Sequence, residues 1–299
     1  MMAVVRETRG DRIFMVINYV ILGLIGLAVA YPIIYVLSAS FSDPIAITEG
    51  KVFLLPVGPT LENYSAVVNY SQLWTGYRNS IFYTIAGTAL NLVLTLLMAY
   101  PLSEKVFPFK RLFMGLLTFT MLFNGGLIPT YLLMRQLGFI DTIWVLIIPG
   151  GVSVYNVIVT RTFLESSVPQ ELREAAEIDG CSHFRIFIRV ALPLSGAIIA
   201  VMALFYGTGH WGAYFNAMIY IRTANLQPLQ VVLRNILLLN TADAELIDAY
   251  DPEVAAKMEA LKNSLKYSII VLATAPMLII YPFVQKYFVK GVMVGSLKG

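Results

Sequence analysis

Residues 167–193 read SVPQELREAAEIDGCSHFRIFIRVALP, and this stretch decides how the rest of the chain is interpreted. Ser167 and Gln170 have the spacing of a capping box, and Pro169 suits the first turn of a helix. Gly180 is well placed as the left-handed residue that ends such a helix. The pattern therefore predicts a helix of about three turns, followed by a second helical run to the end of the stretch.

A helix this short needs a surface to pack on, because isolated helices under about 12–15 residues are marginal in water. Ala175 and Ala176 have small side chains that would let another protein approach closely. Glu174 and Asp179 would supply charge around that contact. The alternative is a two-helix loop that packs only on its own protein.

The composition points to a membrane rather than to water. The chain has 299 residues, of which 58% are hydrophobic and 13% are charged, and its mean hydropathy is +0.73. Soluble domains carry about 25% charged residues. The net charge of +3 is too small to indicate nucleic acid. One cysteine, Cys181, excludes an intrachain disulfide, and with two histidines it supplies no ligand set for a structural zinc.

Gaps between charged residues place the membrane spans, because a charge at a helix centre costs about 2.5–3.5 kcal/mol. A span needs about 20 apolar residues. Six gaps are long and apolar enough to hold a span. The next longest gap between charged residues, 62–78, is rich in polar side chains and is expected to lie in water. The first span begins like a signal peptide but is too long for one, so we expect it to remain uncleaved. One transmembrane domain over residues 1–299 is predicted, with six spans at 13–39, 80–102, 112–134, 143–163, 194–221 and 266–288.

Lys and Arg residues orient these spans. They are enriched in the segments that are cytoplasmic when the N-terminus is inside, and the short loop 103–111 is the best single indication. Both termini are therefore predicted in the cytoplasm, with the loop 164–193 inside and the loop 223–263 outside. The outer loop contains the apolar stripe of an amphipathic helix at 229–237. That helix either lies over the mouth of the protein or offers a docking surface to an external partner, and the two are compatible.

The stretch first quoted also holds fixed residue types at fixed spacings, namely Glu174, Ala175, Ala176, Gly180, Val190, Leu192 and Pro193. This pattern resembles the signature loop of ABC-importer permeases. The chain departs from the family where Cys181 follows the glycine and where a second proline is absent. Further segments resemble the carbohydrate-uptake, maltose-type branch, and more narrowly permeases of complex oligosaccharide importers, some of which take alginate or pectin fragments. These segments are GLIPTY at 126–131, GHW at 209–211, FNAMIY at 215–220 and PLQ at 228–230.

The resemblance implies an all-α integral membrane fold, the six-helix ABC type I importer permease with a cytoplasmic coupling helix, in a bacterial inner membrane. It implies a heterodimer with a second permease, two ATPase subunits that bind ATP and Mg, and a periplasmic or lipid-anchored solute-binding protein that delivers a saccharide. The loop 223–263 would contact that protein. ATPase coupling is assigned to Glu174, Ala175, Ala176, Asp179 and Gly180. The C-terminal tail resembles the family's and assigns a further ATPase contact to Gly295, Ser296 and Lys298.

Irregular sequence inside the spans suggests where a solute would pass. The third span contains Asn124-Gly125-Gly126, and irregular backbone at membrane depth is tolerated only against protein or a water-filled cavity. Close packing on small residues explains such sequence equally well. The fifth span holds the most polar and aromatic patch, which consists of His210, Trp211, Tyr214 and Asn216. The patch either lines the pathway or serves as interface anchors, gate or packing residues.

Three classes of protein are alternatives to a saccharide ABC permease. A gradient-driven secondary transporter is expected to carry charges inside its spans, and the six gaps between charged residues that place the spans are free of them. An ABC permease for a non-sugar solute remains compatible with the coupling loop. A membrane enzyme would need a catalytic constellation within the spans, and none is found. Gly50-Lys51 is followed by Val52 and lacks the rest of a P-loop, so ATP hydrolysis is assigned to partner subunits, and no catalytic, metal or cofactor site is expected here.

Overall fold

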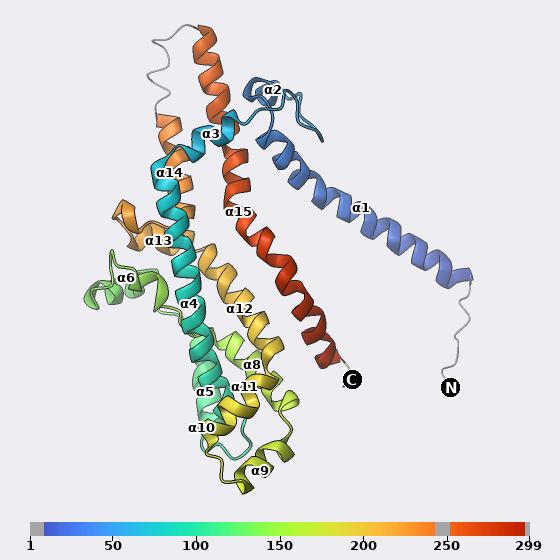
Figure 1. Ribbon diagram of the computed structural model, residues 1–299, viewed down its shortest axis with the longest axis vertical. Helices are drawn as coiled ribbons and strands as arrows, with labels where there is room; N and C mark the ends of the chain where they lie inside the picture. Colours follow the sequence, from blue (N-terminus) through green and yellow to red (C-terminus); the bar gives the residue numbers. More distant parts are fainter. Residues whose placement is uncertain (1–8, 243–251, 297–299) are drawn as a thin grey trace. The chain divides into compact units, whose positions relative to one another are not determined.

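The computed structural model describes residues 9–242 and 252–296, and their regular structure is helical throughout (Figure 1). The helices up to the middle of the chain are α1 Arg9–Ser40, α2 Pro44–Thr48, α3 Glu62–Val68, α4 Ser71–Ser103, α5 Lys110–Leu122, α6 Leu127–Gln136, α7 Trp144–Ile147 and α8 Val154–Ser167. The remainder are α9 Gln170–Ile178, α10 His183–Ile186, a π-helix η1 Phe187–Ala191, α11 Leu192–Leu194, α12 Gly196–Trp211, α13 Tyr214–Tyr220, a 3-10 helix η2 Ala224–Leu226, α14 Leu229–Ala242 and α15 Pro252–Ser296.

The chain forms two compact units. The first unit comprises residues 1–70 and 235–274, and the second comprises 71–234 and 275–299. In the first unit, Tyr35 of α1 meets Tyr267 of α15 edge-on, with ring centroids 5.6 Å apart. Most of α1 is apolar and exposed, as expected for a helix whose solvent is lipid rather than water.

The sequence predicted that the polar segment 62–78 lies in water, but the structure buries part of it. Asn63 is fully buried in the first unit. Its amide donates to the carbonyl of Ser42 at 3.2 Å and its side-chain oxygen accepts from the Ser264 hydroxyl. A buried amide is tolerated when its hydrogen-bonding groups find partners. Those partners come from segments distant in sequence, so the local composition could not reveal them.

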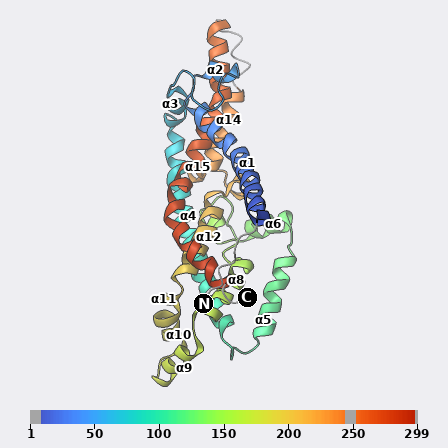
Figure 2. The same cartoon turned by 90° about the vertical axis from the view of Figure 1, so that its right-hand side faces the viewer.

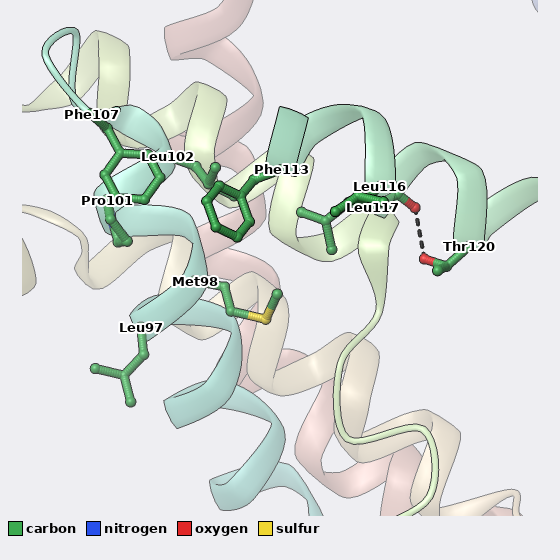
Figure 3. Close-up of a pocket in the computed structure, with 9 residues that line it drawn as sticks. All are labelled: Leu97, Met98, Pro101, Leu102, Phe107, Phe113, Leu116, Leu117 and Thr120. Carbon is green, nitrogen blue, oxygen red and sulfur yellow. Dashed lines mark hydrogen bonds between the residues drawn. The ribbon is translucent and has the colours of Figure 1, made fainter. Parts of the chain in front are cut away.

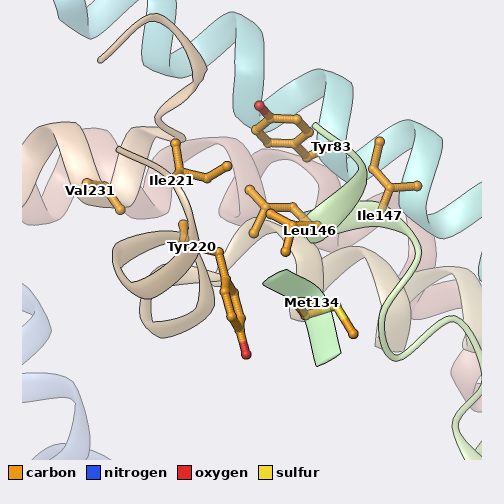
Figure 4. Close-up of a cluster of buried hydrophobic side chains, with 9 residues drawn as sticks. Tyr83, Met134, Leu146, Ile147, Tyr220, Ile221 and Val231 are labelled. Atoms are coloured by element: carbon orange, nitrogen blue, oxygen red, sulfur yellow. The ribbon is translucent and has the colours of Figure 1, made fainter. Parts of the chain in front are cut away.

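The second unit is organised around α4, which packs against α12 and α8. Its 33 residues give a length of about 50 Å, well beyond the hydrocarbon core of a bilayer, which is about 30 Å. Inside the unit, Thr95 of α4 hydrogen-bonds Tyr206 of α12 at 2.6 Å. A cluster of buried side chains joins α4 to α7 and α13 (Figure 4) and includes Tyr83, Leu146, Ile147, Tyr220 and Ile221.

Among the described residues, three helices are long and apolar enough to cross a membrane: α1, α4 and Glu259–Pro282 of α15. The number is five if each of two bent helix pairs counts as one span: α5 with α6, bent by 111°, and 183–194 with α12, bent by 81°. The predicted span at 143–163 is covered by α7 and α8, which a non-helical segment at 148–153 separates. The count of six spans stays a prediction.

The sharp bend between α5 and α6 has a local cause. The side-chain oxygen of Asn124 accepts a hydrogen bond from the backbone N–H of Gly126 at 2.9 Å, which closes a turn. Gly126 itself has φ +86, a conformation that a residue with a Cβ rarely adopts. The irregularity expected at residues 124–126 is therefore confirmed.

The amphipathic helix expected at 229–237 is also confirmed, as α14. Its stripe residues Leu229, Val232, Leu233 and Ile236 are all buried. Side chains of α4 hold the chain that leads into it. Asn79 donates to the carbonyls of residues 225 and 227 at 2.7 and 3.0 Å, the Ser80 hydroxyl accepts the N–H of Leu229 at 2.8 Å, and the Tyr83 hydroxyl donates to residue 226 at 2.8 Å.

Candidate functional site

The predicted helix after residue 167 is present as α9, but its first turn differs from the expectation. The capping box is wrong, because Ser167 is the last residue of α8 and Pro169 occupies the N-cap without a side-chain hydrogen bond. The serine was already taken up by the preceding helix, which a local pattern cannot show. Gln170 instead donates its side-chain amide to Glu174, one turn ahead, at 2.8 Å. In Figures 1 and 2, α9 lies beyond the end of α4, at one extreme of the second unit.

The end of α9 is as predicted. Gly180 has φ +74 and sits at the C′ position. Its N–H donates to the carbonyl of Glu177 at 2.9 Å, and the N–H of Cys181 donates to the carbonyl of Ala176 at 2.9 Å. These two bonds form a Schellman motif, in which a left-handed glycine lets the last carbonyls of a helix find donors. The cap fixes where α9 stops and where the chain turns towards α10.

The outer face of α9 is available to another protein. Of the five residues predicted for coupling, Glu174, Ala175, Asp179 and Gly180 are exposed and Ala176 is half-buried. Apolar side chains next to them are exposed as well, with Leu172 at 47%, Ile178 at 87% and Phe184 at 65%. Leu172 and Ile178 lie on α9 and Phe184 lies on α10, and exposed apolar side chains grouped in this way indicate an interaction surface.

The second helical run packs on the protein itself. Ile186 and Phe187 are buried, and the Phe187 ring lies 4.9 Å from that of Tyr100 in α4. The run contains the π-helix η1, in which the N–H of Leu192 donates to the carbonyl of Phe187, five residues back. Pro193 follows and has no N–H to donate. Ile186 and Phe187 thus pack on the protein, while α9 keeps an exposed face whose docking to another protein stays a prediction.

The inner face of α9 is held by Arg173, a residue that the sequence analysis missed. Arg173 is 7% exposed. Its Nη1 lies 2.7 Å from a carboxylate oxygen of Glu104, and its Nη2 donates to the Ser103 hydroxyl and the Leu164 carbonyl, both at 3.4 Å. Its guanidinium carbon lies 5.8 Å from the centroid of the Tyr100 ring. The only signal in the sequence is one arginine on an otherwise acidic helix.

A second ion cluster adjoins this contact. Glu165 at the end of α8 binds Lys110 of α5 at 2.8 Å and Arg161, one turn earlier, at 2.7 Å. Arg161 also donates from Nε to the carbonyl of Leu102 in α4 at 3.0 Å. Burial acts to raise the pKa of Glu165, but the hydrogen bonds and positive charges of Lys110 and Arg161 outweigh it and the pKa is lowered. The carboxylate is thus held in its charged form between three helices.

A cleft of about 560 Å³ lies between α9 and the loop that follows α4. Five glutamates line it, together with Lys105 and Arg173. Two of the five are paired with cations in the contacts just described. The others are on α9, and the cleft therefore has an acidic rim. These glutamates are Glu104, Glu165, Glu171, Glu174 and Glu177.

The polar patch predicted to line a pathway is divided by the structure. His210 and Trp211 end α12 and face α4. A Cβ placed on Gly87 would overlap the His210 ring, and Trp211 is 7% exposed with its ring 6.4 Å from that of Tyr77. Tyr214 and Asn216 lie beyond a break at 212–213, at the start of α13. The two halves of the patch are therefore on different helices, and their contact with a solute stays a prediction.

Asn216 is exposed, whereas the Tyr214 hydroxyl donates to the sulfur of Met218 at 3.2 Å. The ATPase contact assigned to the three tail residues also stays a prediction. Gly295 and Ser296 belong to the last turn of α15, and Lys298 lies outside the described residues.

At the end of the second unit opposite α9, Asp141 connects two loops, a contact that the sequence analysis also missed. Asp141 has φ +60 and accepts the N–H groups of Arg222 and Thr223, each at 2.8 Å, and the Thr223 hydroxyl at 2.7 Å. Its own N–H donates to the carbonyl of Tyr220 at 2.9 Å. The two Thr223 bonds and then that of Arg222 lower the pKa of Asp141. In the sequence this residue was only the charge that marks the start of a span.

An apolar pocket of about 340 Å³ lies between α4 and α5 (Figure 3). Its single hydroxyl, on Thr120, already donates to the carbonyl of Leu117 at 2.8 Å. The rest of the lining is apolar. Its lining is typical of a surface that faces lipid or another apolar helix.

Comparisons with known proteins show the family of the chain. Residues 1–294 match the family described as binding-protein-dependent transport system inner membrane component. Protein LplC of Bacillus subtilis (strain 168) is 39% identical over 98% of this chain and 97% of its own length. The polygalacturonan/rhamnogalacturonan transport system permease protein YtcP of the same strain is 35% identical over 97% of this chain and 99% of its own.

A solved structure is similar as well. It is that of a bacterial ABC transporter involved in the import of the acidic polysaccharide alginate, with a TM-score of 0.82 at 36% identity over 94% of this chain and 99% of the solved one. The fold is therefore shared with that solved transporter. This chain belongs to the family of inner-membrane components of binding-protein-dependent transport systems.

Proposed function

We propose that this chain is the permease subunit of an ABC importer that carries oligosaccharides across a bacterial inner membrane, driven by ATP hydrolysis in partner subunits. One observation carries the proposal: α9 presents Glu174, Ala175 and Asp179 on an exposed face while Arg173 anchors its other face. A helix fixed on one side and open on the other is suited to receive a motor protein and pass its motion on.

The substrate class proposed is an acidic oligosaccharide. Two similar proteins are named for acidic polysaccharides, one for polygalacturonan and rhamnogalacturonan and one for alginate. We assign contact with the solute to the exposed start of α13, where Tyr214 and Asn216 offer an aromatic face and an amide. His210 and Trp211, packed on α4, would act as gate residues behind it.

The partners proposed are a second permease, two ATPase subunits and a solute-binding protein outside the membrane. One ATPase would take α9 through its exposed Leu172 and Ile178. The second permease and lipid would cover the exposed apolar surface of α1. The outer loop 223–263 would contact the binding protein. This arrangement places both termini in the cytoplasm, in agreement with the Lys and Arg distribution.

Reconstitution in proteoliposomes tests the proposal. The chain is assembled with its second permease, ATPases and binding protein, and uptake of uronate oligosaccharides is compared with uptake of neutral ones of the same length. We expect ATP-dependent uptake of the uronates and none without the ATPases. Uptake that proceeds without ATPases would contradict the importer assignment. ATP-dependent uptake of neutral oligosaccharides alone would contradict only the acidic substrate class.

A further inference from the structure

Removing the charges of Arg173 and Glu104 from solvent costs free energy, so stability alone explains their contact poorly. Arg173 is nearly removed from solvent, and a buried ion pair often stabilises a protein no more than apolar residues of the same volume would. What such a pair does provide is a defined geometry. The guanidinium is bound from three directions, by Glu104, by Ser103 and by the Leu164 carbonyl.

These partners lie at the ends of membrane helices. Ser103 is the last residue of α4, Glu104 follows it, and Leu164 is in the last turn of α8. Lys110 strengthens the junction, because its Nζ donates to the backbone carbonyl of Glu104 at 3.3 Å as well as to Glu165. The base of α9 is therefore tied to α4, α5 and α8 at one point.

From this point, α4 leads directly to the other end of the second unit. The helix is continuous over 33 residues, and its opposite end carries Asn79, Ser80 and Tyr83, which hold the chain entering α14. Between these two ends, Thr95 bonds Tyr206 of α12. A displacement of α9 that reaches α4 would thus arrive at both the outer loop and the helix that ends in His210.

We propose that the Arg173–Glu104 pair is the joint through which α9 moves α4, so that both are positioning residues for coupled transport. The inference rests on the proposed function of α9 as the docking helix for an ATPase. Motion of a docked helix is transmitted only if its base is rigid relative to the element it drives. Without the pair, α9 would still bind the ATPase through its exposed face, but its motion would not be transmitted to α4.

The test uses the complete importer and measures uptake per ATP hydrolysed. Glu104→Gln keeps the shape of the side chain and removes its charge, and Arg173→Gln removes the other partner. The charge-swapped protein, with Glu104→Arg and Arg173→Glu, restores a pair of opposite charges. The matched control is Glu49→Gln, which breaks an exposed ion pair with Lys51 whose N–O distance is 2.6 Å.

We expect both single variants to assemble and to keep their ATPase activity, while uptake per ATP falls by about fivefold or more, the lower end of coupling between sites. The charge-swapped protein is expected to regain part of the lost ratio, and Glu49→Gln to match the wild type. An unchanged ratio in both single variants would overturn the inference. So would failure of Glu104→Gln to assemble, since the pair would then serve folding alone.

The wild-type complex separates this inference from the proposed function. If it transports with ATP hydrolysis and the variants do so with the same ratio, only the joint is wrong. If the wild-type chain binds no ATPase, or its uptake consumes no ATP, the proposed function fails and the joint with it.

Discussion

Under the proposed orientation, the second unit has an inner end, around α9, and an outer end, where Asp141 binds the backbone of Arg222 and Thr223. The two ends are held by different contacts. At the inner end, charged side chains from separate helices pair with one another, as Arg173 does with Glu104. At the outer end, side chains bind backbone groups, as Asp141 and Asn79 do. Ion pairs join side chains of separate helices, whereas side-chain bonds to the backbone fix the path of the chain. The inner end is thus suited to tie α9 to the helices it would move, and the outer end to keep its shape.

The largest contrast is expected from valine substitutions at two glycines. Gly180 at the inner end and Gly138 at the outer end have φ +74 and +69, and an added Cβ would meet no atom within 4 Å at either site. The left-handed conformation costs a residue with a Cβ about 1–2 kcal/mol in both cases. We expect Gly180→Val to lower ATP-driven uptake by about tenfold or more, because the end of α9 is displaced.

Gly138→Val serves as the matched control and should retain most of the uptake despite the same local strain. Equal losses in the two variants, measured in the reconstituted importer, would mean that the position of the strain is irrelevant and would remove the functional difference between the two ends.

A smaller effect, on stability rather than transport, is expected at the outer end. Asn79→Ala removes two hydrogen bonds and leaves the carbonyls of Asn225 and Gln227 without these donors. The cost should be about 1–3 kcal/mol in the free energy of unfolding, measured by denaturation of the purified chain in detergent. Asn216→Ala, at an exposed amide, should change it by less than about 0.5 kcal/mol. Indistinguishable results would show that the outer contacts do not fix the chain.

The smallest expected effect is the change that salt and pH make to the stability contributed by each end. The pKa values of Glu165 and Asp141 are both lowered in the fold, so each carboxylate stabilises it at neutral pH and loses that contribution as the pH falls through the folded-state pKa. High salt should weaken only the Glu165 cluster, because it screens charge pairs more than backbone hydrogen bonds. The difference should be about 0–1 kcal/mol.

The measurement is thermal unfolding of Glu165→Gln and Asp141→Asn at neutral pH in low and high salt. Stability of the Glu165→Gln protein should depend less on salt than that of the wild type, whereas the Asp141→Asn protein should keep the salt dependence of the wild type. The reverse order would contradict the assignment of ion pairs to the inner end.

Local signals in the sequence were sufficient for α9 and α14. Gly180 ends its helix because its conformation depends on two neighbouring backbone bonds, and the stripe from Leu229 to Ile236 follows the helical period. The contacts that the sequence did not reveal join distant segments. Arg173 lies 70 residues from Ser103, to which it donates, and on its own helix it reads as one more charge on a solvated face.

The bend between α5 and α6 and the start of α9 could be predicted only in part. Asn124 and Gly126 indicate that a helix breaks, but the angle of 111° depends on what the two arms pack against. The capping box failed because Ser167 could belong to either helix, and in the structure it is the last residue of α8.

The π-helix at 187–191 has a consequence for how the chain can change in length. A π-turn encloses one residue more than the α-turn it replaces, so the backbone between α10 and α12 contains one residue of slack. A chain lacking one residue here could close ordinary turns and leave both flanking helices in place. Within α12 itself, by contrast, losing a residue would rotate every later side chain by about 100° and move His210 away from Gly87.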